Sequence, residues 1–599
     1  MSKNILPKRD EVDDNFKWRL EDIYPTEADW EKDYKTVKSL IPGIEGHRGK
    51  LSASSKGLLE GLGHYYATQR ILEKLYSYAR MRRDEDNANS KYQALTDRAE
   101  SLLVEFSSAS SYIVPEIISI DEDMLKDWIE KNKEFDEYRQ FLDEIIREKD
   151  HVLSPEEERI LAMAGEVCGA PSLIFSMLND ADMKFPHIKN EEGEEVELTK
   201  GRYIAFLESK DRRVRKDAFK TLYATYSKQK NTIATTFVSS LKKDNFISSA
   251  RRYNSSLEAA LSSDNVGIDV YDNLINAVEN NLESMYRYLD VRKRALGLDE
   301  LHMYDVYVPI VKDIDMKIPY EEGKEMIIKA LEPLGKDYVN GLKEGFESGW
   351  IDRYENVGKT SGAYSWGCYD AHPYVLMNYQ DNLNSVFTLA HEMGHAMHTY
   401  HSNKNQPYPL AGYRIFVAEV ASTLNEILLT HYLLDTIDDD TTRAYIVNNH
   451  LEGFKGTVYR QTMFAKFEQI AHGKILEGIP LTFEDLCDIY YKLVKKYHGE
   501  GVVADKEIAM EWMRIPHFYR AFYVYKYAIG FSAASSIAKG ILEGKPGAVD
   551  KYIEFLSSGG SDYPIELLKK AGVDMSTPEP VDEGLKVFDS FVTELDNII

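Results

Sequence analysis

The chain has 599 residues, of which 43% are hydrophobic and 29% are charged, with 36 Gly and 19 Pro. This composition excludes collagen-like and disordered proteins, because enough apolar surface is present to offset the entropy lost on folding. The formal net charge of −26 repels phosphate backbones and anionic bilayers, so we expect neither nucleic acid nor a membrane as a partner.

The cysteines and the amino-terminal residues indicate the compartment. Cys168, Cys368 and Cys487 are too few and too scattered for a disulfide framework, which suits a reducing environment. Charged residues from Lys8 onward interrupt any apolar core of a secretory signal. The longest weakly charged stretch, residues 522–542, contains two lysines and falls short of a transmembrane span. We therefore expect a cytoplasmic protein.

The first third of the chain has the pattern of a helical bundle. From Glu27 to about Phe175, apolar residues recur at spacings of three and four, with charged faces between them. Thr26 stands before the first of these helices, and Ser154 precedes Pro155 and a run of acids. Both are typical helix start signals. The sequence predicts a mainly α fold.

A β-hairpin is predicted between Lys184 and Leu198, where two short strand-like runs flank an acidic turn with glycine. We expect this hairpin to end an N-terminal helical domain of residues 1–200. A second domain of residues 201–599 would follow. Helical periodicity there is broken by three strand-like runs, at Met303–Ile310, Ala363–Tyr369 and Tyr374–Tyr379.

The pentapeptide His391-Glu392-Met393-Gly394-His395 fits the pattern H-E-x-x-H on a helix. At about 100° per residue, His391 and His395 lie on one face and one turn apart, so both imidazoles can bind one Zn²⁺. Glu392 projects beside them and can accept a proton from a water whose acidity the metal raises. The spacing predicts one zinc ion per chain, against the alternative of two ordinary histidines on a helix face.

Catalytic zinc normally takes three protein ligands, and later residues compete for the third place. His398 lies further along the same helix, and His401 stands where a metzincin pattern has its last histidine, although His398 replaces the glycine of that pattern. Glu419 is favoured, because a carboxylate among apolar neighbours is costly unless a cation satisfies it. Glu426 returns to the same face and is either a partner of a ligating imidazole or a solvent-facing acid.

The segments HEMGHAMH and AEVASTLNE resemble the M3 family of zinc oligopeptidases, and SGAYSWGCYDAHPYVLMNYQDN, YRQTMFAKFE and IPHFYRAFYVYKYAIGFSAA resemble its oligoendopeptidase F group. The resemblance covers nearly the whole chain. It implies His391, His395 and Glu419 as zinc ligands and Glu392 as general base and acid. It also implies a neurolysin-like, two-lobed helical metallopeptidase with a deep channel and a small β-sheet near the active site, in which residues 201–599 form the catalytic domain.

Hydrogen-bond donors for the oxyanion are the remaining requirement of such an enzyme. The segment after Ile515 supplies the candidates His517, Tyr519, Tyr523, Tyr525 and Tyr527. On a helix, Tyr523 and Tyr527 would be neighbours four residues apart. More distant relatives of the family use a His followed by two Tyr, which favours His517 and Tyr527, then Tyr523. The assignment among the tyrosines stays open, with core packing as the alternative.

The leading hypothesis is an endopeptidase that hydrolyses short, unstructured oligopeptides with a metal-activated water. The run Ala363–Tyr369 would offer a strand edge to which an extended peptide can bind through its main chain. The alternatives are a helical zinc carboxypeptidase with the same ligands and a metal-free peptide-binding protein with a relic site. Glu392 argues against the second alternative, because binding alone needs no base. The sequence does not indicate the oligomeric state.

Overall fold

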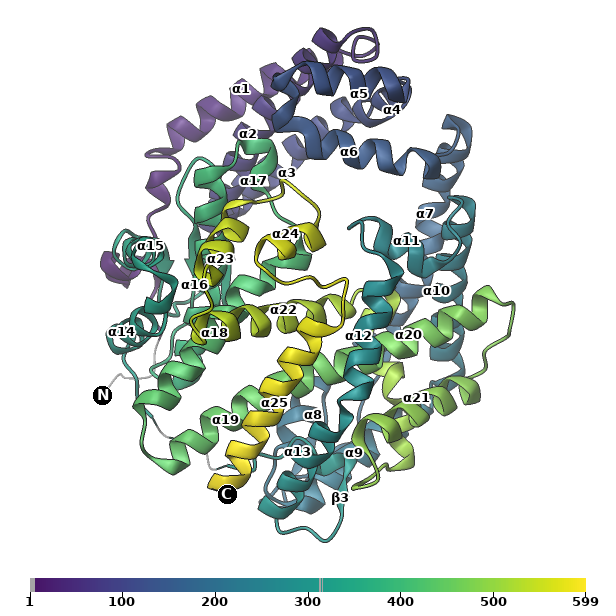
Figure 1. Ribbon diagram of the computed structural model, residues 1–599, viewed down its shortest axis with the longest axis vertical. Helices are drawn as coiled ribbons and strands as arrows, with labels where there is room; N and C mark the ends of the chain where they lie inside the picture. The colour runs from purple at the N-terminus through teal and green to yellow at the C-terminus, as the bar shows by residue number, and fades with distance from the viewer. Residues whose placement is uncertain (1–5, 312–313, 315) are drawn as a thin grey trace. The chain divides into compact units, whose positions relative to one another are not determined.

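The structure is a computed structural model that describes residues 6–311, 314 and 316–599, and it is mainly helical, with short strands (Figure 1). It divides into two compact units, each made of three separate segments. The first unit contains residues 1–149, 315–432 and 537–572, and the second contains residues 150–314, 433–536 and 573–599. The predicted domain border at residue 200 and the deep channel stay predictions.

The first unit contains the helices that carry the candidate metal ligands. Its helices are α1 (Glu27–Glu45), α2 (Ser55–Glu85), α3 (Ser90–Ser110), α4 (Ile113–Ile118), α5 (Glu122–Lys131), α6 (Arg139–Glu148), α14 (Tyr320–Ala330), α15 (Lys336–Glu347), α16 (Leu383–Asn405), α17 (Tyr408–Ala411), α18 (Ile415–Thr436, which ends in the second unit), α23 (Ala548–Ser557) and α24 (Pro564–Lys570). Its strands are β4 (Ile351–Asp352), β5 (Tyr364–Trp366) and β6 (Tyr374–Leu376).

The second unit is also helical. Its helices are α7 (Pro155–Ser176), α8 (Lys200–Leu207), α9 (Arg212–Ser227), α10 (Lys230–Ala250), α11 (Ser256–Ser262), α12 (Ile268–Asn280), α13 (Leu282–Ala295), α19 (Asp440–Phe454), α20 (Arg460–Leu476), α21 (Phe483–His498), α22 (Tyr525–Leu542, which ends in the first unit) and α25 (Glu579–Ile598), with the π-helical turn η9 (Lys455–Tyr459) and the 3₁₀ helix η10 (Lys506–Arg514). Its strands are β1 (His187–Lys189), β2 (Glu195–Glu197), β3 (Leu301–His302) and β7 (Val502–Val503).

Both predicted helix starts are confirmed. The side chain of Thr26 accepts a hydrogen bond from the Asp29 backbone at the start of α1, and Ser154 does the same for Glu157 before α7. These bonds satisfy backbone N–H groups that have no partner inside the helix. Pro155 occupies the first position of α7, where a missing N–H costs nothing.

Three of the four predicted strand regions contain strands. β1 and β2 form the expected antiparallel hairpin, with His187 opposite Glu197. β5 and β6 lie within the second and third runs and join β4 in a sheet of order β4-β6-β5, so β5 is an edge strand. The prediction of a strand over Met303–Ile310 is wrong. β3 ends at His302, whose backbone N–H donates to the Asp305 carboxylate, and this bond closes a 3₁₀ turn instead.

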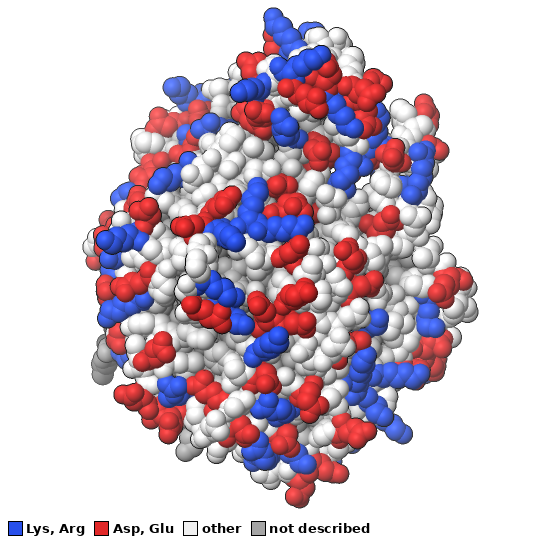
Figure 2. Space-filling view, viewed as in Figure 1, with Lys and Arg blue, Asp and Glu red and all other residues white. Residues whose placement is uncertain are grey.

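Among the described residues, one helical stretch, Pro155–Asp182, is long and apolar enough to cross a membrane by length and composition alone. Most of its side chains are exposed. It differs from residues 522–542, the longest weakly charged stretch of the sequence. On the face drawn in Figure 2, basic and acidic side chains of the described residues are interspersed. The surplus of acidic residues therefore forms no single acidic patch on that face.

A buried carboxylate ties the amino terminus of the first unit to its small sheet. Asp352 on β4 is fully buried and accepts hydrogen bonds from Arg9 at 2.5 and 2.9 Å. The Lys359 ammonium lies 2.6 Å from the same carboxylate. Burial opposes ionisation of Asp352, but the charges of Lys359 and Arg9 hold its pKa below the usual range.

We expect Asp352→Asn to lower the free energy of unfolding by about 3 kcal/mol, because the buried Lys359 ammonium loses its carboxylate partner and Arg9 keeps only Glu85. Urea denaturation at neutral pH measures this difference. Since the folded-state pKa of Asp352 is depressed, its contribution is present at neutral pH and is lost as the pH falls below about 4. Asp14→Asn, at an exposed pair with Lys17, is the control and should leave the midpoint unchanged. Equal midpoints for the two variants would contradict this account.

Candidate metal centre

Two helices of the first unit bring the predicted metal ligands together. Asn382 caps the start of α16 by accepting a hydrogen bond from the Ser385 backbone, and the helix then presents His391 and His395 one turn apart. Glu419 comes from α18. The Nε2 atoms of the two histidines are 3.2 Å apart, and Glu419 Oε2 lies 3.4 Å from His391 Nε2 and 3.7 Å from His395 Nε2.

The three donor atoms fit a zinc ion. Tetrahedral ligands at bond lengths of about 2.0–2.2 Å stand roughly 3.3–3.6 Å from one another, which is close to the observed triangle. His391, His395 and Glu419 are the only group of three such side chains found among the described residues whose donor atoms converge in this way. Two imidazoles and one carboxylate leave one corner of the tetrahedron for water or substrate.

The close contact of α16 with α18 depends on Gly394. A Cβ atom on this residue would lie 2.5 Å from Ser422 Cα, 2.7 Å from the carbonyl oxygen of Ala421 and 2.8 Å from Ser422 N. All three are backbone atoms of α18, which cannot move aside independently of the helix. The glycine within the motif therefore allows the two backbones to approach closely enough for Glu419 to reach both histidines.

Glu426 fixes the orientation of His391. Its Oε1 atom lies 2.6 Å from His391 Nδ1 and accepts the hydrogen bond from that side of the ring, which leaves Nε2 directed toward Glu419 and His395. Of the two alternatives for Glu426, the structure confirms a partner of the imidazole. Burial opposes charge on His391, but the carboxylate of Glu426, helped by Glu392 and Glu419, raises its pKa to about 9.

Glu392 lies next to the ligands but is not one of them. Only 8% of its surface is exposed, and its carboxylate accepts a hydrogen bond from the backbone N–H of Ser365 on β5. Burial, together with the charges of Glu419 and Glu426, raises the pKa of Glu392 to about 7, although His391 opposes this shift. A carboxylate with a pKa near neutrality can both accept and return a proton.

The two further histidines of α16 lie outside the donor group. His398 is fully buried and stacks on Tyr413 with ring centroids 3.7 Å apart. His401 is also buried and stacks on Tyr338 at 5.8 Å. No motif in the sequence points to Tyr413. Its hydroxyl lies 2.9 Å from that of Thr399 and so supports the turn of α16 that follows His395.

The candidate oxyanion donors His517, Tyr523 and Tyr527 form a cluster of rings in the second unit. The rings of Tyr523 and Tyr527 meet edge to face at 5.4 Å, and His517 lies 6.2 Å from Tyr523 and 6.3 Å from Tyr527. Tyr523 and Tyr527 do not share a helix, so the condition for an i, i+4 pair is not met. α22 begins at Tyr525, because Phe522 adopts a left-handed conformation with φ of 54° and turns the chain before the helix.

The other two tyrosines of that segment are part of the packing of the second unit. Tyr519 shares a hydrogen bond of 2.9 Å with Thr236 and stacks on Phe175 at 4.4 Å. Tyr525 is fully buried against Tyr271. Within the set, His517 is exposed, Tyr519, Tyr523 and Tyr527 are partly exposed, and Tyr525 is buried.

A helical fold with a convergent His, His and Glu donor set and an adjacent acid defines a metallopeptidase. Comparison with known proteins agrees: residues 205–587 match the model of peptidase family M3, and residues 116–185 match the model described as Oligopeptidase F. The chain belongs to peptidase family M3. It is a metallopeptidase of the oligoendopeptidase F group, which acts on peptides.

Similar proteins span the same length. The chain is 51% identical to oligopeptidase PepF of Bacillus subtilis, over all of this chain and 89% of the relative. It is 40% identical to group B oligopeptidase PepB of Streptococcus agalactiae, over 99% of this chain and 98% of the relative. The solved structure of oligoendopeptidase F from Enterococcus faecium matches 96% of this chain and 99% of its own, with 38% identity and a TM-score of 0.73.

We expect Gly394→Ala to weaken metal retention by about 10- to 100-fold, because the added Cβ forces α18 away from α16 and draws Glu419 and Glu426 from the histidines. Metal analysis after dialysis against a weak chelator measures the loss. Gly473→Ala is the matched control in α20, where a Cβ would meet nothing within 4 Å. If both variants keep the metal equally well, the close approach of the helices is not what positions the ligands.

Proposed function

We propose that the protein is a zinc-dependent endopeptidase that hydrolyses short, unstructured oligopeptides, with Glu392 as general base and acid. One observation carries this proposal: the triangle of His391, His395 and Glu419 donor atoms, with the buried Glu392 carboxylate beside it. Membership of the M3 family supports peptides as substrates. The cytoplasmic location expected from the sequence is part of the proposal.

The metal would be held by His391 and His395 through Nε2 and by Glu419 through a carboxylate oxygen. When bound, Zn²⁺ would supply Lewis acidity, lowering the pKa of water toward 7 and polarising the carbonyl of the substrate. Glu426 keeps His391 in the tautomer that offers Nε2, since its carboxylate accepts the hydrogen bond from Nδ1. The donor set of nitrogen and oxygen atoms is one that suits zinc.

Glu392 would perform the proton transfers. Its carboxylate accepts a proton from the attacking water and delivers that proton to the nitrogen of the departing amine, so that the peptide bond breaks without a free alkoxide or amide anion. Burial raises the pKa of Glu392 toward neutrality, so that the group can both accept the proton from water and release it to the amine. The backbone N–H of Ser365 holds the carboxylate in place.

The edge strand β5 supports an extended peptide as the substrate. β5 pairs with β6 on one side only, and its residue Ser365 contacts Glu392. A peptide that added a strand at this edge would present its main chain to the metal centre through backbone hydrogen bonds, largely independent of side-chain sequence. A folded protein cannot offer a free backbone in this way, and therefore we propose unstructured oligopeptides.

The decisive assay uses a peptide that is acetylated at its amino terminus and amidated at its carboxyl terminus. An endopeptidase cleaves this peptide, a chelator abolishes the cleavage, and added Zn²⁺ restores it. A requirement for a free carboxyl terminus would favour the carboxypeptidase alternative, and undiminished cleavage in the chelator would exclude the zinc mechanism.

We expect Glu392→Gln to keep the fold and the metal but to abolish hydrolysis, because the amide is nearly isosteric and cannot accept the proton of the water. Metal content and turnover are measured on the same preparation. Glu419→Ala is the contrasting variant, which should lose the metal. A Glu392→Gln enzyme that remains active and zinc-dependent would remove Glu392 from the mechanism.

We expect Tyr527→Phe to lower kcat and kcat/KM together by about 10²–10³, with KM little changed, if its hydroxyl stabilises charge that develops only in the transition state. Tyr523→Phe is the matched control, since its ring packs against the same His517. A large loss in Tyr523→Phe alone would exchange the roles of the two tyrosines. Full activity of both variants would assign the oxyanion to another group.

A further inference from the structure

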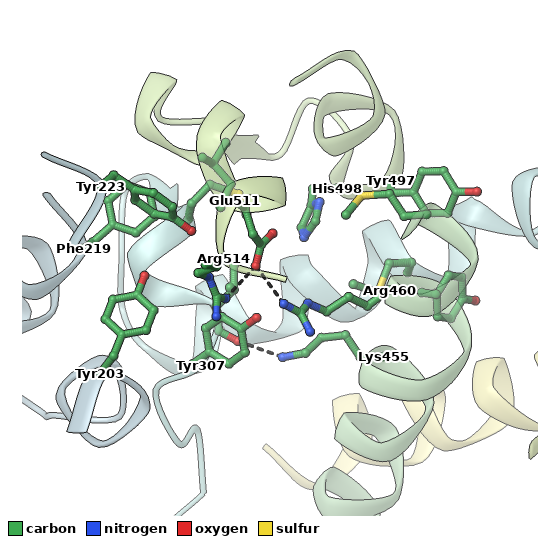
Figure 3. Close-up of a pocket in the computed structure, with 16 residues that line it drawn as sticks. Tyr203, Phe219, Tyr223, Tyr307, Lys455, Arg460, Tyr497, His498, Glu511 and Arg514 are labelled. Carbon is green, nitrogen blue, oxygen red and sulfur yellow. Dashed lines mark hydrogen bonds and ion pairs between the residues drawn. The ribbon is translucent and has the colours of Figure 1, made fainter. Parts of the chain in front are cut away.

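A small cavity with several charged side chains in its wall lies wholly within the second unit. It has a volume of about 40 Å³ and is lined by side chains of α8, α9, α13, α20, α21 and η10, of the turn η9 and of the segment 303–307 (Figure 3). By the same measure one water needs about 10–15 Å³, so there is room for roughly three waters or one small oxyanion. The proposed peptidase chemistry uses none of its residues.

Three cationic side chains face this cavity. Figure 3 shows the guanidinium groups of Arg460 and Arg514 and the ammonium of Lys455 directed toward the same space beside Tyr307. Their side chains are 28%, 20% and 10% exposed, respectively. Glu511 is the only carboxylate that lines the cavity among the described residues.

Both oxygen atoms of the Glu511 carboxylate already accept hydrogen bonds from neighbouring side chains. Glu511 Oε1 accepts from both Arg460 and Arg514, at 2.8 and 2.7 Å, and its Oε2 accepts from Tyr490 at 2.6 Å. Each guanidinium has five N–H donors, and Nε of Arg514 has no hydrogen-bond partner. Several donors of these two arginines therefore remain available to a molecule in the cavity.

The positive charge around the cavity is not balanced. Lys455 pairs with Glu452 at 2.5 Å, but Glu452 also pairs with the buried Arg292 at 2.7 Å. Together with the Arg460, Arg514 and Glu511 group, four cations share two carboxylates. Burial and the charges of Arg292 and Arg460 lower the pKa of Lys455 to about 8, although Glu452 opposes this. Uncompensated buried charge of this kind is costly unless an anion pairs with it.

Backbone geometry places two of the cations together. η9 is a π-helical turn in which the Arg460 N–H donates to the Lys455 carbonyl oxygen. In a regular α-helix, side chains five residues apart point in very different directions, and the wider π-turn reduces this difference. Lys455 and Arg460 consequently line the same cavity. Such turns occur frequently at functional sites.

We propose that this cavity is a binding site for a small oxyanion, a carboxylate or a phosphate, held by Lys455, Arg460 and Arg514. A guanidinium fork matches the geometry of either group, and an anion there would offset the surplus of positive charge. The carboxylate could come from a free acid or from the carboxyl terminus of a peptide, and these two sources share the same recognition chemistry.

The test is the thermal unfolding midpoint of the wild-type protein in sodium phosphate and in sodium acetate, each compared with sodium chloride at equal ionic strength. A specific site should raise the midpoint by about 1–3 °C and saturate with anion concentration. No shift with either anion would overturn the proposal without any variant being needed.

Two variants locate the site. Lys455→Met leaves Glu452 paired with Arg292, and Arg514→Gln leaves Glu511 paired with Arg460, so neither strands a carboxylate. Each should lose the anion-dependent shift. Arg294→Gln, at an exposed pair in the same unit, is the matched control and should keep it. An equal shift in both cavity variants and in the control would place the anion elsewhere and overturn the assignment.

A final arm distinguishes the two sources of the carboxylate. The thermal unfolding midpoint of the Glu392→Gln variant is measured with a peptide that has a free carboxyl terminus and with the amidated form of the same peptide. Greater stabilisation by the free acid, lost on adding Lys455→Met, assigns the cavity to a peptide terminus, whereas equal stabilisation assigns it to the free anions. The anion titration needs no turnover, so its failure is distinguishable from failure of the proposed peptidase function.

Discussion

The backbone contact at Gly394 is the constraint on which the metal centre depends. Helices in proteins usually pack about 8–10 Å apart, which would leave a glutamate of α18 short of the two histidines. The missing Cβ brings the backbone of α18 against α16, and the seven-residue spacing of Glu419 and Glu426 then sets two carboxylates on one face. One of them reaches the Nε2 side of the histidines and the other the Nδ1 side of His391.

The two units handle buried charge in opposite ways. Around the metal centre, Glu392, Glu419 and Glu426 surround His391 and His395, and this arrangement favours a cation. In the second unit, cations outnumber carboxylates around a small cavity, which favours an anion. A protein with a net charge of −26 thus keeps a locally positive interior, which shows that the overall charge does not determine the chemistry of its sites.

Much of the metal centre could be predicted from the sequence, because its signals are local or lie in neighbouring helices. The spacing of His391 and His395, the caps of α1 and α7 and the β1–β2 hairpin depend on a few adjacent residues. Whether a helix includes Tyr523 could not be decided from the sequence, because periodicity does not reveal a single left-handed residue such as Phe522. The group of Lys455, Arg460, Arg514 and Glu511 could not be predicted, since its members come from separate elements that only tertiary packing brings together.

The segmented composition of the units has a consequence for synthesis of the protein. The first unit contains α16 and also residues 537–572, and α23 from that late segment packs directly on α16. A ribosome that has completed residues 391–426 has therefore made every candidate metal ligand but not α23, the helix that packs on α16. The first unit therefore cannot complete its packing until about the last tenth of the chain has been synthesised, and until then the apolar face of α16 that α23 covers stays exposed, a condition that favours aggregation.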